Sequence, residues 1–305
     1  MKILITGGTG LVGTRLSEML LDAGHEVALL SRGAAPAAGG IRSFRWDPAA
    51  GTIDEAAVPY ADAIVNLAGS NVGEGKWTAA RKRDILASRL DGLALLHRAL
   101  ARPGHRVHTL VSASAVGRYG DAGDALLTED APLGPPDDFL AQVVRQWEEA
   151  AAPIAALGLR VVLPRIGVVL APDGGALPQM ARPVKLGAGA PLGSGKQWVS
   201  WIHRDDLCRL LLAMLENPAW RGPYNAVATY PATNEAFTEV LAAVLHRPLL
   251  LPHVPAFGLK LALGEMSAIV LASQRVSNAK VLAQGFAFEF PDLKSALRAL
   301  YAQSA

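Results

Sequence analysis

Cysteine is almost absent from this sequence. Cys208 is the one cysteine among 305 residues, and no group of cysteines and histidines has the spacing of a zinc site. A single cysteine excludes a disulfide within the chain, and disulfides are typical of oxidising compartments. The sequence therefore predicts a protein of a reducing compartment, by default the cytoplasm, without a metal site.

Charge is also scarce, and neither sign forms a run. Charged side chains make up 18% of the sequence, against about 25% in an average soluble protein. The 29 Lys and Arg nearly balance the 27 Asp and Glu, so there is no basic patch to bind nucleic acid. With 51% hydrophobic residues, disorder is excluded as the dominant state. We expect a folded core and a small-molecule partner.

No apolar run is long enough for a transmembrane helix. Such a helix needs about 18 consecutive apolar residues, and charged residues divide the most apolar C-terminal stretch, at Arg247, Lys260, Glu265 and Arg275. Residues 1–6 lead straight into glycines and lack the features of a signal peptide. We expect neither a membrane anchor nor secretion, and the sequence leaves the oligomeric state open.

Hydrophobic periodicity predicts a parallel α/β fold. Short buried-strand patterns alternate with helical ones: strands are expected at 2–6, 26–30, 63–67, 107–112 and 160–163, and helices at 11–23, 78–101 and 138–157. This alternation is typical of a Rossmann-type, doubly wound parallel sheet with helices on both faces.

Glycine and proline cluster after residue 170 and indicate a second lobe. We expect a cofactor-binding domain over 1–170 and a smaller α/β substrate lobe over 171–305. Around 200–230 we expect the chain to return to the first lobe, with a helix at 205–215. Further helices are expected within 233–302, with a connector at 250–255 and an aromatic strand at 286–290.

A glycine-rich loop joins the first strand to the first helix. Its spacing is G-x-x-G-x-x-G, and its expected contacts are Gly7, Gly10, Leu11, Val12 and Gly13. Glycine allows a tight turn and lets a pyrophosphate approach the backbone, where the helix N-terminus favours negative charge. The loop therefore predicts a dinucleotide site; the alternative is a glycine-rich turn without a ligand.

The end of the second strand indicates which dinucleotide binds. NAD sites usually carry an acidic residue there, whereas this chain has Ser31 and Arg32. A guanidinium pairs well with a 2′-phosphate, which predicts NADP(H), unless Arg32 is only a solvated surface residue. Asn66, Ala68 and Gly69 end another strand beside the expected cofactor; alternatively, Asn66 caps a turn.

Several motifs resemble the extended short-chain dehydrogenase/reductases: TGGTGLVG at 6–13, NLAG at 66–69, SASAVGRYG at 112–120 and WIHRDD at 201–206. More narrowly, SAVGRYG at 114–120, WE at 147–148, GSGKQ before SWIH at 193–203, and RP at 247–248 before VP at 254–255 resemble epimerase-family proteins described as nucleoside-diphosphate-sugar epimerases. The resemblance spans nearly the whole chain. It implies an NADP(H)-binding lobe and a C-terminal lobe that closes over substrate, with a domain of unknown function at about 248–295.

The sequence departs from the superfamily in one catalytic feature. Most members carry Tyr-x-x-x-Lys on the helix after the serine-bearing strand, where the Tyr exchanges a proton and the Lys lowers its pKa. None of the five tyrosines here has a lysine four positions on, and 138–157 contains neither residue. The equivalent positions fall near Phe139 or Leu140, and near Val143 or Val144.

Two hydroxyls are the remaining catalytic candidates. The resemblance matches Ser114 to the active-site serine, whose hydroxyl polarises a carbonyl; the alternative is a hydroxyl satisfied by its turn. Tyr119 follows on the same loop and is the candidate acid in place of the missing tyrosine; the alternative is a packing aromatic.

The second lobe supplies candidate substrate contacts, namely Lys196, Gln197, Trp201 and His203. Trp198 and Trp201 are oddly spaced, so on a strand only one of them faces a ligand. His203 is alternatively a helix-start residue, and Asp205 and Asp206 are expected to cap that helix.

Two functions follow from these residues. The first is an NADP(H)-dependent oxidoreductase or epimerase acting on a nucleotide sugar or a similar hydroxyl or carbonyl compound. The second is a catalytically weak NADP(H)-binding sensor or interaction protein.

Overall fold

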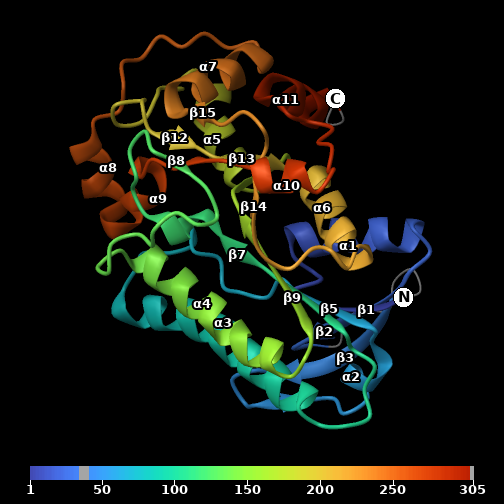
Figure 1. Ribbon diagram of the computed structural model, residues 1–305. Coiled ribbons are helices and arrows are strands. Elements are labelled where there is room, and N and C mark those ends of the chain that lie inside the picture. Colours follow the sequence, from blue (N-terminus) through green and yellow to red (C-terminus); the bar gives the residue numbers. More distant parts are fainter. Residues whose placement is uncertain (34–40, 303–305) are drawn as a thin grey trace.

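A computed structural model describes residues 1–33 and 41–302, and a mostly parallel sheet lies at its centre (Figure 1). The strand order is β14-β9-β6-β5-β1-β2-β3-β4, and β7 also pairs with β9. Within this sheet β4 is the antiparallel strand, and the other pairings are parallel. The strands are β1 (Lys2–Thr6), β2 (Glu26–Ser31), β3 (Arg42–Asp47), β4 (Thr52–Ile53), β5 (Ala63–Asn66), β6 (Thr109–Ser112), β7 (Ser114–Ala115), β9 (Arg160–Ile166) and β14 (Gly222–Ala226).

Helices cover both faces of this sheet (Figure 1). One face packs against α1 (Leu11–Asp22) and α6 (Arg204–Glu216), and the other against α3 (Ala79–Leu100) and α4 (Phe139–Ala156). The short helix α2 spans Ala57–Tyr60. This arrangement is the doubly wound α/β fold that the sequence predicts.

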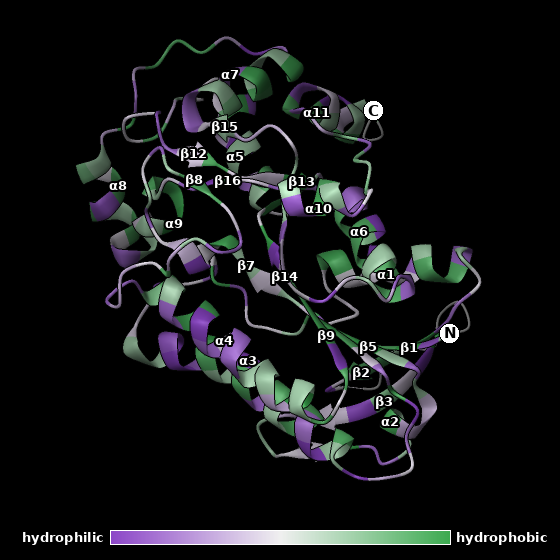
Figure 2. Cartoon of the chain, in the orientation of Figure 1, coloured by the Kyte–Doolittle hydropathy of each residue, from purple (hydrophilic) through white to green (hydrophobic). Residues whose placement is uncertain are grey.

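The central strand β1 shows how the two cores arise from one sequence pattern. Ile3, Leu4 and Ile5 are all fully buried, with Ile3 and Ile5 in the core under α1 and Leu4 in the core under α3. Successive strand residues point to opposite faces, so a continuous apolar run fills both. The hydrophobic colouring of the central strands is visible in Figure 2.

Outside the central sheet, the strands are β8 (Leu126–Leu127), β10 (Val168–Ala171), β11 (Gly174–Gly175), β12 (Trp198–Val199), β13 (Trp201–His203), β15 (Ala232–Thr233) and β16 (Arg275–Val276). The helices not yet named are α5 (Ala176–Lys185), α7 (Asn234–Val244), α8 (Ala256–Leu263), α9 (Ala268–Leu271), α10 (Ala279–Ala283) and α11 (Leu293–Ala302), with the 3-10 helices η1 (Val116–Tyr119) and η2 (Gly264–Ser267). Helices α5, α7 and α11 pack against a small sheet, β11-β10-β13, around buried Trp201 and Phe237. Two further strand pairs join β12 with β15 and β16 with β8.

Most expected elements form, with small shifts at their ends. β9 continues to Ile166 rather than ending at 163, and the chain does return through α6 to β14. Residue 170 lies inside β10, and the division into lobes there stays a prediction. No helix in the described part of the chain is long and apolar enough to cross a membrane.

The aromatic strand expected at 286–290 is wrong. The amides of Glu289 and Phe290 donate instead to the two carboxylate oxygens of Asp206, each at 2.9 Å. Phe286 and Phe288 contact each other edge to face and pack against the core under α1. A buried carboxylate therefore takes the amide hydrogen bonds that a neighbouring strand would need.

Candidate functional site

Of the three glycines in the G-x-x-G-x-x-G spacing, packing requires two and leaves the third open. A Cβ at Gly7, where φ is +70°, would lie 2.8 Å from the carbonyl carbon of Leu67, and one at Gly13 would lie 2.3 Å from the Gly7 oxygen. At Gly10 the nearest atom would be the same oxygen at 3.3 Å. Gly7 and Gly13 thus hold the loop against its surroundings, while Gly10 keeps its backbone open to a ligand.

The first turn of α1 is also available to a ligand. Gly10 is the N-cap and provides no side-chain hydrogen bond. Within the described residues, no acceptor is found for the amides of Leu11, Val12 and Gly13, as expected for the first turn of a helix. Amides without an acceptor beside an open glycine fit the pyrophosphate of a dinucleotide.

Asn66 joins three strand ends beneath this loop. Its Oδ1 accepts from the Thr6 hydroxyl at 2.7 Å, and its Nδ2 donates to the Ser112 hydroxyl at 3.0 Å. The Ala68 amide donates to the hydroxyl oxygen of Thr6 at 3.2 Å. Asn66 is buried, so its side chain positions the loop carrying Ala68 and Gly69 rather than presenting an amide to solvent.

A half-buried guanidinium that the sequence does not reveal lies beside this loop. Arg89, from α3, donates through Nη1 to the carbonyls of Ser70 and Ile85, at 3.1 and 2.9 Å, and lies 4.9 Å from the Trp147 ring centre. It forms no ion pair among the described residues, and its buried Nε has no hydrogen-bond partner there. Desolvation lowers its pKa to about 10. Partial burial of a cation without a counter-ion costs free energy, which an anionic ligand would offset.

Ser31 and Arg32 follow β2 at the same edge of the sheet. The Ser31 hydroxyl accepts from the Gly33 amide at 3.3 Å, and Arg32 is exposed. Arg32 has no ion pair with any described residue, although 34–40 lie outside that range. Its guanidinium is therefore available to a phosphate.

Ser114, at the end of the sheet, is differently engaged. Its hydroxyl donates to Oε1 of Glu148, on α4, at 2.6 Å, and the side chain is almost fully buried. The same carboxylate receives two hydrogen bonds from Arg165, at 2.8 and 3.1 Å, and an ion pair from Arg118 at 3.3 Å. The hydroxyl proton thus points to a carboxylate and not to a substrate carbonyl, unlike the predicted role.

Tyr119 belongs to the same buried network. Its hydroxyl donates to Oδ1 of Asn225 at 2.7 Å and accepts from Nη1 of Arg165 at 2.9 Å. Burial raises the pKa of the phenol. Arg165 is paired with Glu148 near the end of the sheet. Tyr119 packs as an aromatic in this structure, which was the alternative to an acid.

The candidate substrate contacts in the second lobe mostly serve packing. Gln197 is buried and donates through Nε2 to the carbonyls of Leu192 and Val270, at 2.9 and 3.1 Å. Trp201 is fully buried, and its Nε1 donates to the Tyr230 carbonyl. Their side chains therefore do not reach a ligand in this conformation.

The two tryptophans take different environments, as their spacing predicts. Trp198, which is half-buried, donates through Nε1 to Asp124 at 2.8 Å, and the Arg275 guanidinium lies 4.8 Å from its ring centre. Trp201, the predicted substrate contact, lies in the core. Trp198 is therefore the tryptophan nearer the surface. Lys196 is exposed.

His203 begins α6 as its N-cap. Nδ1 accepts from the Asp205 amide at 3.1 Å, the ring stacks on Phe290 at 4.0 Å, and burial lowers its pKa. A helix-start role, the alternative considered from sequence, accounts for these contacts. The expected capping by the carboxylates is wrong, because Asp205 pairs with Arg15 and Asp206 accepts the two amides of 289 and 290.

An apolar cluster occupies the part of α4 where the superfamily has its Tyr and Lys. Val143 is buried with Trp77 and Ile85, and the partly buried Phe139, Leu140 and Met266 pack on them. Lys82 of α3 and Glu265 of η2 form an ion pair beside the cluster. No group of metal-ligating side chains exists among the described residues.

The chain is similar to known proteins along its whole length. Residues 3–227 match the NAD dependent epimerase/dehydratase family, and residues 254–300 match a domain of unknown function, DUF1731. The epimerase family protein YfhF of Bacillus subtilis is 38% identical over 99% of this chain and 98% of its own length.

Two solved structures add to this. That of human epimerase family protein SDR39U1 with NADPH is 35% identical, with a TM-score of 0.87 over 99% of both chains. That of a nucleoside-diphosphate sugar epimerase from Corynebacterium glutamicum is 33% identical, with a TM-score of 0.79 over 99% of this chain and 60% of the other. The protein described here therefore belongs to the NAD dependent epimerase/dehydratase family.

Proposed function

We propose that this protein binds NADP(H) at the carboxyl edge of its sheet. The contacts are Gly7, Gly10, Leu11, Val12 and Gly13 for the pyrophosphate, Ser31 and Arg32 for the adenosine 2′-phosphate, and Ala68 and Gly69 along the chain of the cofactor, with Asn66 positioning them. The carrying observation is that Arg32 has no ion pair among the described residues and no carboxylate ends β2. The NADPH in the similar human structure supports the same cofactor.

Arg89 extends this proposed site. Its guanidinium lies against the loop of Gly69, where a Cβ would come within 3.1 Å of it. An anionic cofactor nearby would offset the charge that no carboxylate among the described residues neutralises. We therefore assign Arg89 to the cofactor cleft together with Arg32.

The reaction that we propose is oxidation, reduction or epimerisation of a nucleotide sugar or a similar hydroxyl or carbonyl compound. The bound nicotinamide supplies or accepts the hydride. Ser114 and Tyr119 are the candidate proton-handling hydroxyls, provided that substrate draws them from Glu148 and Asn225. Of the predicted substrate contacts, Lys196 has the exposed side chain suited to a phosphorylated ligand, and the name of the Corynebacterium relative supports that substrate class.

A catalytically weak sensor or interaction protein is the second candidate. One observation favours it: both hydroxyls are buried and already donate to protein acceptors. General acid or base groups typically contribute about 10²- to 10⁴-fold, so their commitment elsewhere leaves a slow reaction. Either function fits the cytoplasm predicted from the sequence, although one relative, from Arabidopsis thaliana, is named chloroplastic.

Hydride transfer to and from the cofactor distinguishes the two functions. Purified protein would be offered aldehydes and sugars with deuterated NADPH, and sugar nucleotides with NADP⁺. Deuterium in the reduced product, NADPH formed from NADP⁺, and any epimeric sugar nucleotide would be measured by mass spectrometry, absorbance and chromatography. We expect slow transfer to at least one class, and Tyr119→Phe should lower kcat clearly while NADPH affinity stays nearly unchanged. Full activity of Tyr119→Phe would refute its assignment, and tight NADPH binding without any transfer would favour the sensor.

A further inference from the structure

A polar cavity of about 410 Å³ adjoins the outer side of the glycine loop. Gly10 and Leu11 line it from the start of α1, Arg204 lines it from the start of α6, and Asp173 lines it from the turn between β10 and β11; the other lining residues are Thr9, Thr14, Arg15, Glu18 and Gly174. Leu11 also touches the turn after β10, since a Cβ at Gly174 would lie 3.0 Å from its side chain. The cavity thus joins the predicted pyrophosphate position to side chains that the glycine motif does not include.

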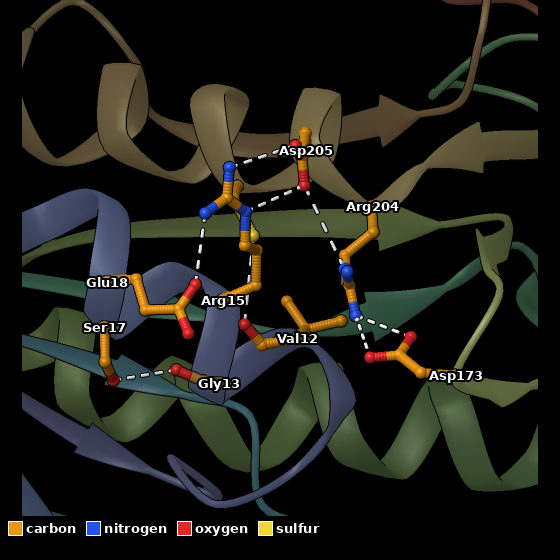
Figure 3. A network of polar contacts seen from close by, with 9 residues as sticks. Val12, Gly13, Arg15, Ser17, Glu18, Asp173, Arg204 and Asp205 are labelled. Atoms are coloured by element: carbon orange, nitrogen blue, oxygen red, sulfur yellow. Dashed lines mark hydrogen bonds and ion pairs between the residues drawn. The ribbon is translucent and has the colours of Figure 1, made fainter. Parts of the chain in front are cut away.

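The two arginines of this cavity differ in their remaining hydrogen-bond capacity (Figure 3). Arg15 donates through Nε and Nη2 to Asp205, at 3.0 and 3.1 Å, and through Nη1 to Glu18 at 3.1 Å. Arg204 uses Nη1 alone, which donates to both oxygens of Asp173 at 2.7 and 2.8 Å. Its Nε is buried and without a hydrogen-bond partner among the described residues, 3.9 Å from Asp205. No acceptor is found among the described residues for its Nη2 either, so Arg204 retains this donor for a ligand.

Asp173 is the ion-pair partner of Arg204. Its side chain is 62% exposed, and the hydrogen bond from Arg204 holds its pKa below the usual value. Arg15 and Arg204 face three carboxylates in all, those of Glu18, Asp173 and Asp205. An incoming phosphate would be attracted by Arg204 and repelled by Asp173, so the two residues act on an anion in opposite directions.

We propose that Arg204 binds the pyrophosphate of the dinucleotide and that Asp173 competes with the cofactor for this guanidinium. The inference rests on the proposed function and adds a residue of α6 to the cofactor site. The pyrophosphate is common to NADPH and NADH, so Arg204 contributes equally to both. Arg32, at the 2′-phosphate, contributes only to NADPH.

The test compares Arg204→Met with Arg209→Met, which also removes an ion-paired arginine from α6 but lies outside the cavity. Calorimetric titrations use NADPH, NADH and 2′-AMP, which lacks a pyrophosphate. We expect Arg204→Met to weaken NADPH and NADH by about tenfold or more, as for lost charge-assisted hydrogen bonds. Its affinity for 2′-AMP should not change, and Arg209→Met should leave all three affinities near their original values.

Asp173→Asn provides the opposite change. Removing the competing carboxylate should tighten NADPH and NADH by roughly threefold, and raising the salt concentration should reduce this gain. Unchanged dinucleotide affinity in Arg204→Met would overturn the inference, and so would an equal loss of 2′-AMP binding, which indicates a general structural defect. If the unmodified protein binds neither dinucleotide, the proposed function itself fails; if it binds both and only the Arg204 effect is missing, this inference alone fails.

Discussion

The glycine-loop region and the Ser114 network around Glu148 differ in how many of their polar groups have hydrogen-bond partners within the protein. At the glycine loop, the first-turn amides of α1 and the guanidiniums of Arg32 and Arg89 have no anionic partner among the described residues. Around Glu148, the Ser114 hydroxyl of β7 and the Arg165 guanidinium of β9 both donate to one carboxylate. Polar donors without a protein acceptor are available to a ligand, whereas donors already bonded to a carboxylate are not. The difference fits the proposed anionic ligand at the glycine loop and a structural role for the Ser114 network.

In the glycine-loop region, Gly10→Val should have the largest effect on NADPH binding. The new side chain would fill the space left for the pyrophosphate, and we expect NADPH affinity to fall by roughly a hundredfold or more, as for the loss of several charge-assisted hydrogen bonds. The fold should persist, because a Cβ at Gly10 meets one backbone oxygen at 3.3 Å. Fluorescence titration measures the affinity, and circular dichroism the fold.

Gly258→Val is the matched control. Gly258 lies on α8, and a Cβ there would meet no atom within 4 Å. It should bind NADPH as the original protein does. A folded Gly10→Val that retains its affinity would show that the open glycine has no part in binding.

In the Ser114 network, Glu148→Ala should lower the free energy of unfolding and leave NADPH affinity unchanged. It leaves Arg165, 3% exposed, without its carboxylate partner, and losing one partner of a buried ion pair costs about 3–5 kcal/mol. Urea unfolding should show this loss, and Glu148→Gln, which still accepts hydrogen bonds, should lose less. If Glu148→Ala keeps its stability but no longer binds NADPH, the contrast between the glycine-loop region and the Ser114 network is mistaken.

Sequence patterns predicted the features that are local in the chain. The glycine loop, the strand it follows and the helix it opens lie within residues 2–22, and their periodicity and spacing suffice. The apolar occupants of the usual Tyr and Lys positions were also readable from helix register.

Features that depend on distant residues were not predictable in this way. Ser114 and Glu148 are 34 residues apart, and the tyrosine acceptor Asn225 is 106 residues from Tyr119, so no pattern announces either hydrogen bond. Arg89 occurs in an ordinary helical repeat, and only the fold shows that it is half-buried without a carboxylate partner among the described residues. Tertiary contacts likewise replaced the aromatic strand by bonds to Asp206.

Titration of the unmodified protein and of Arg32→Ala with NADPH and NADH tests the central claim most directly. We predict that the unmodified protein prefers NADPH, and that Arg32→Ala loses most of this preference while its affinity for NADH stays the same, because the guanidinium meets only the 2′-phosphate. Equal affinities for both cofactors in the unmodified protein, or an undiminished preference in Arg32→Ala, would contradict it.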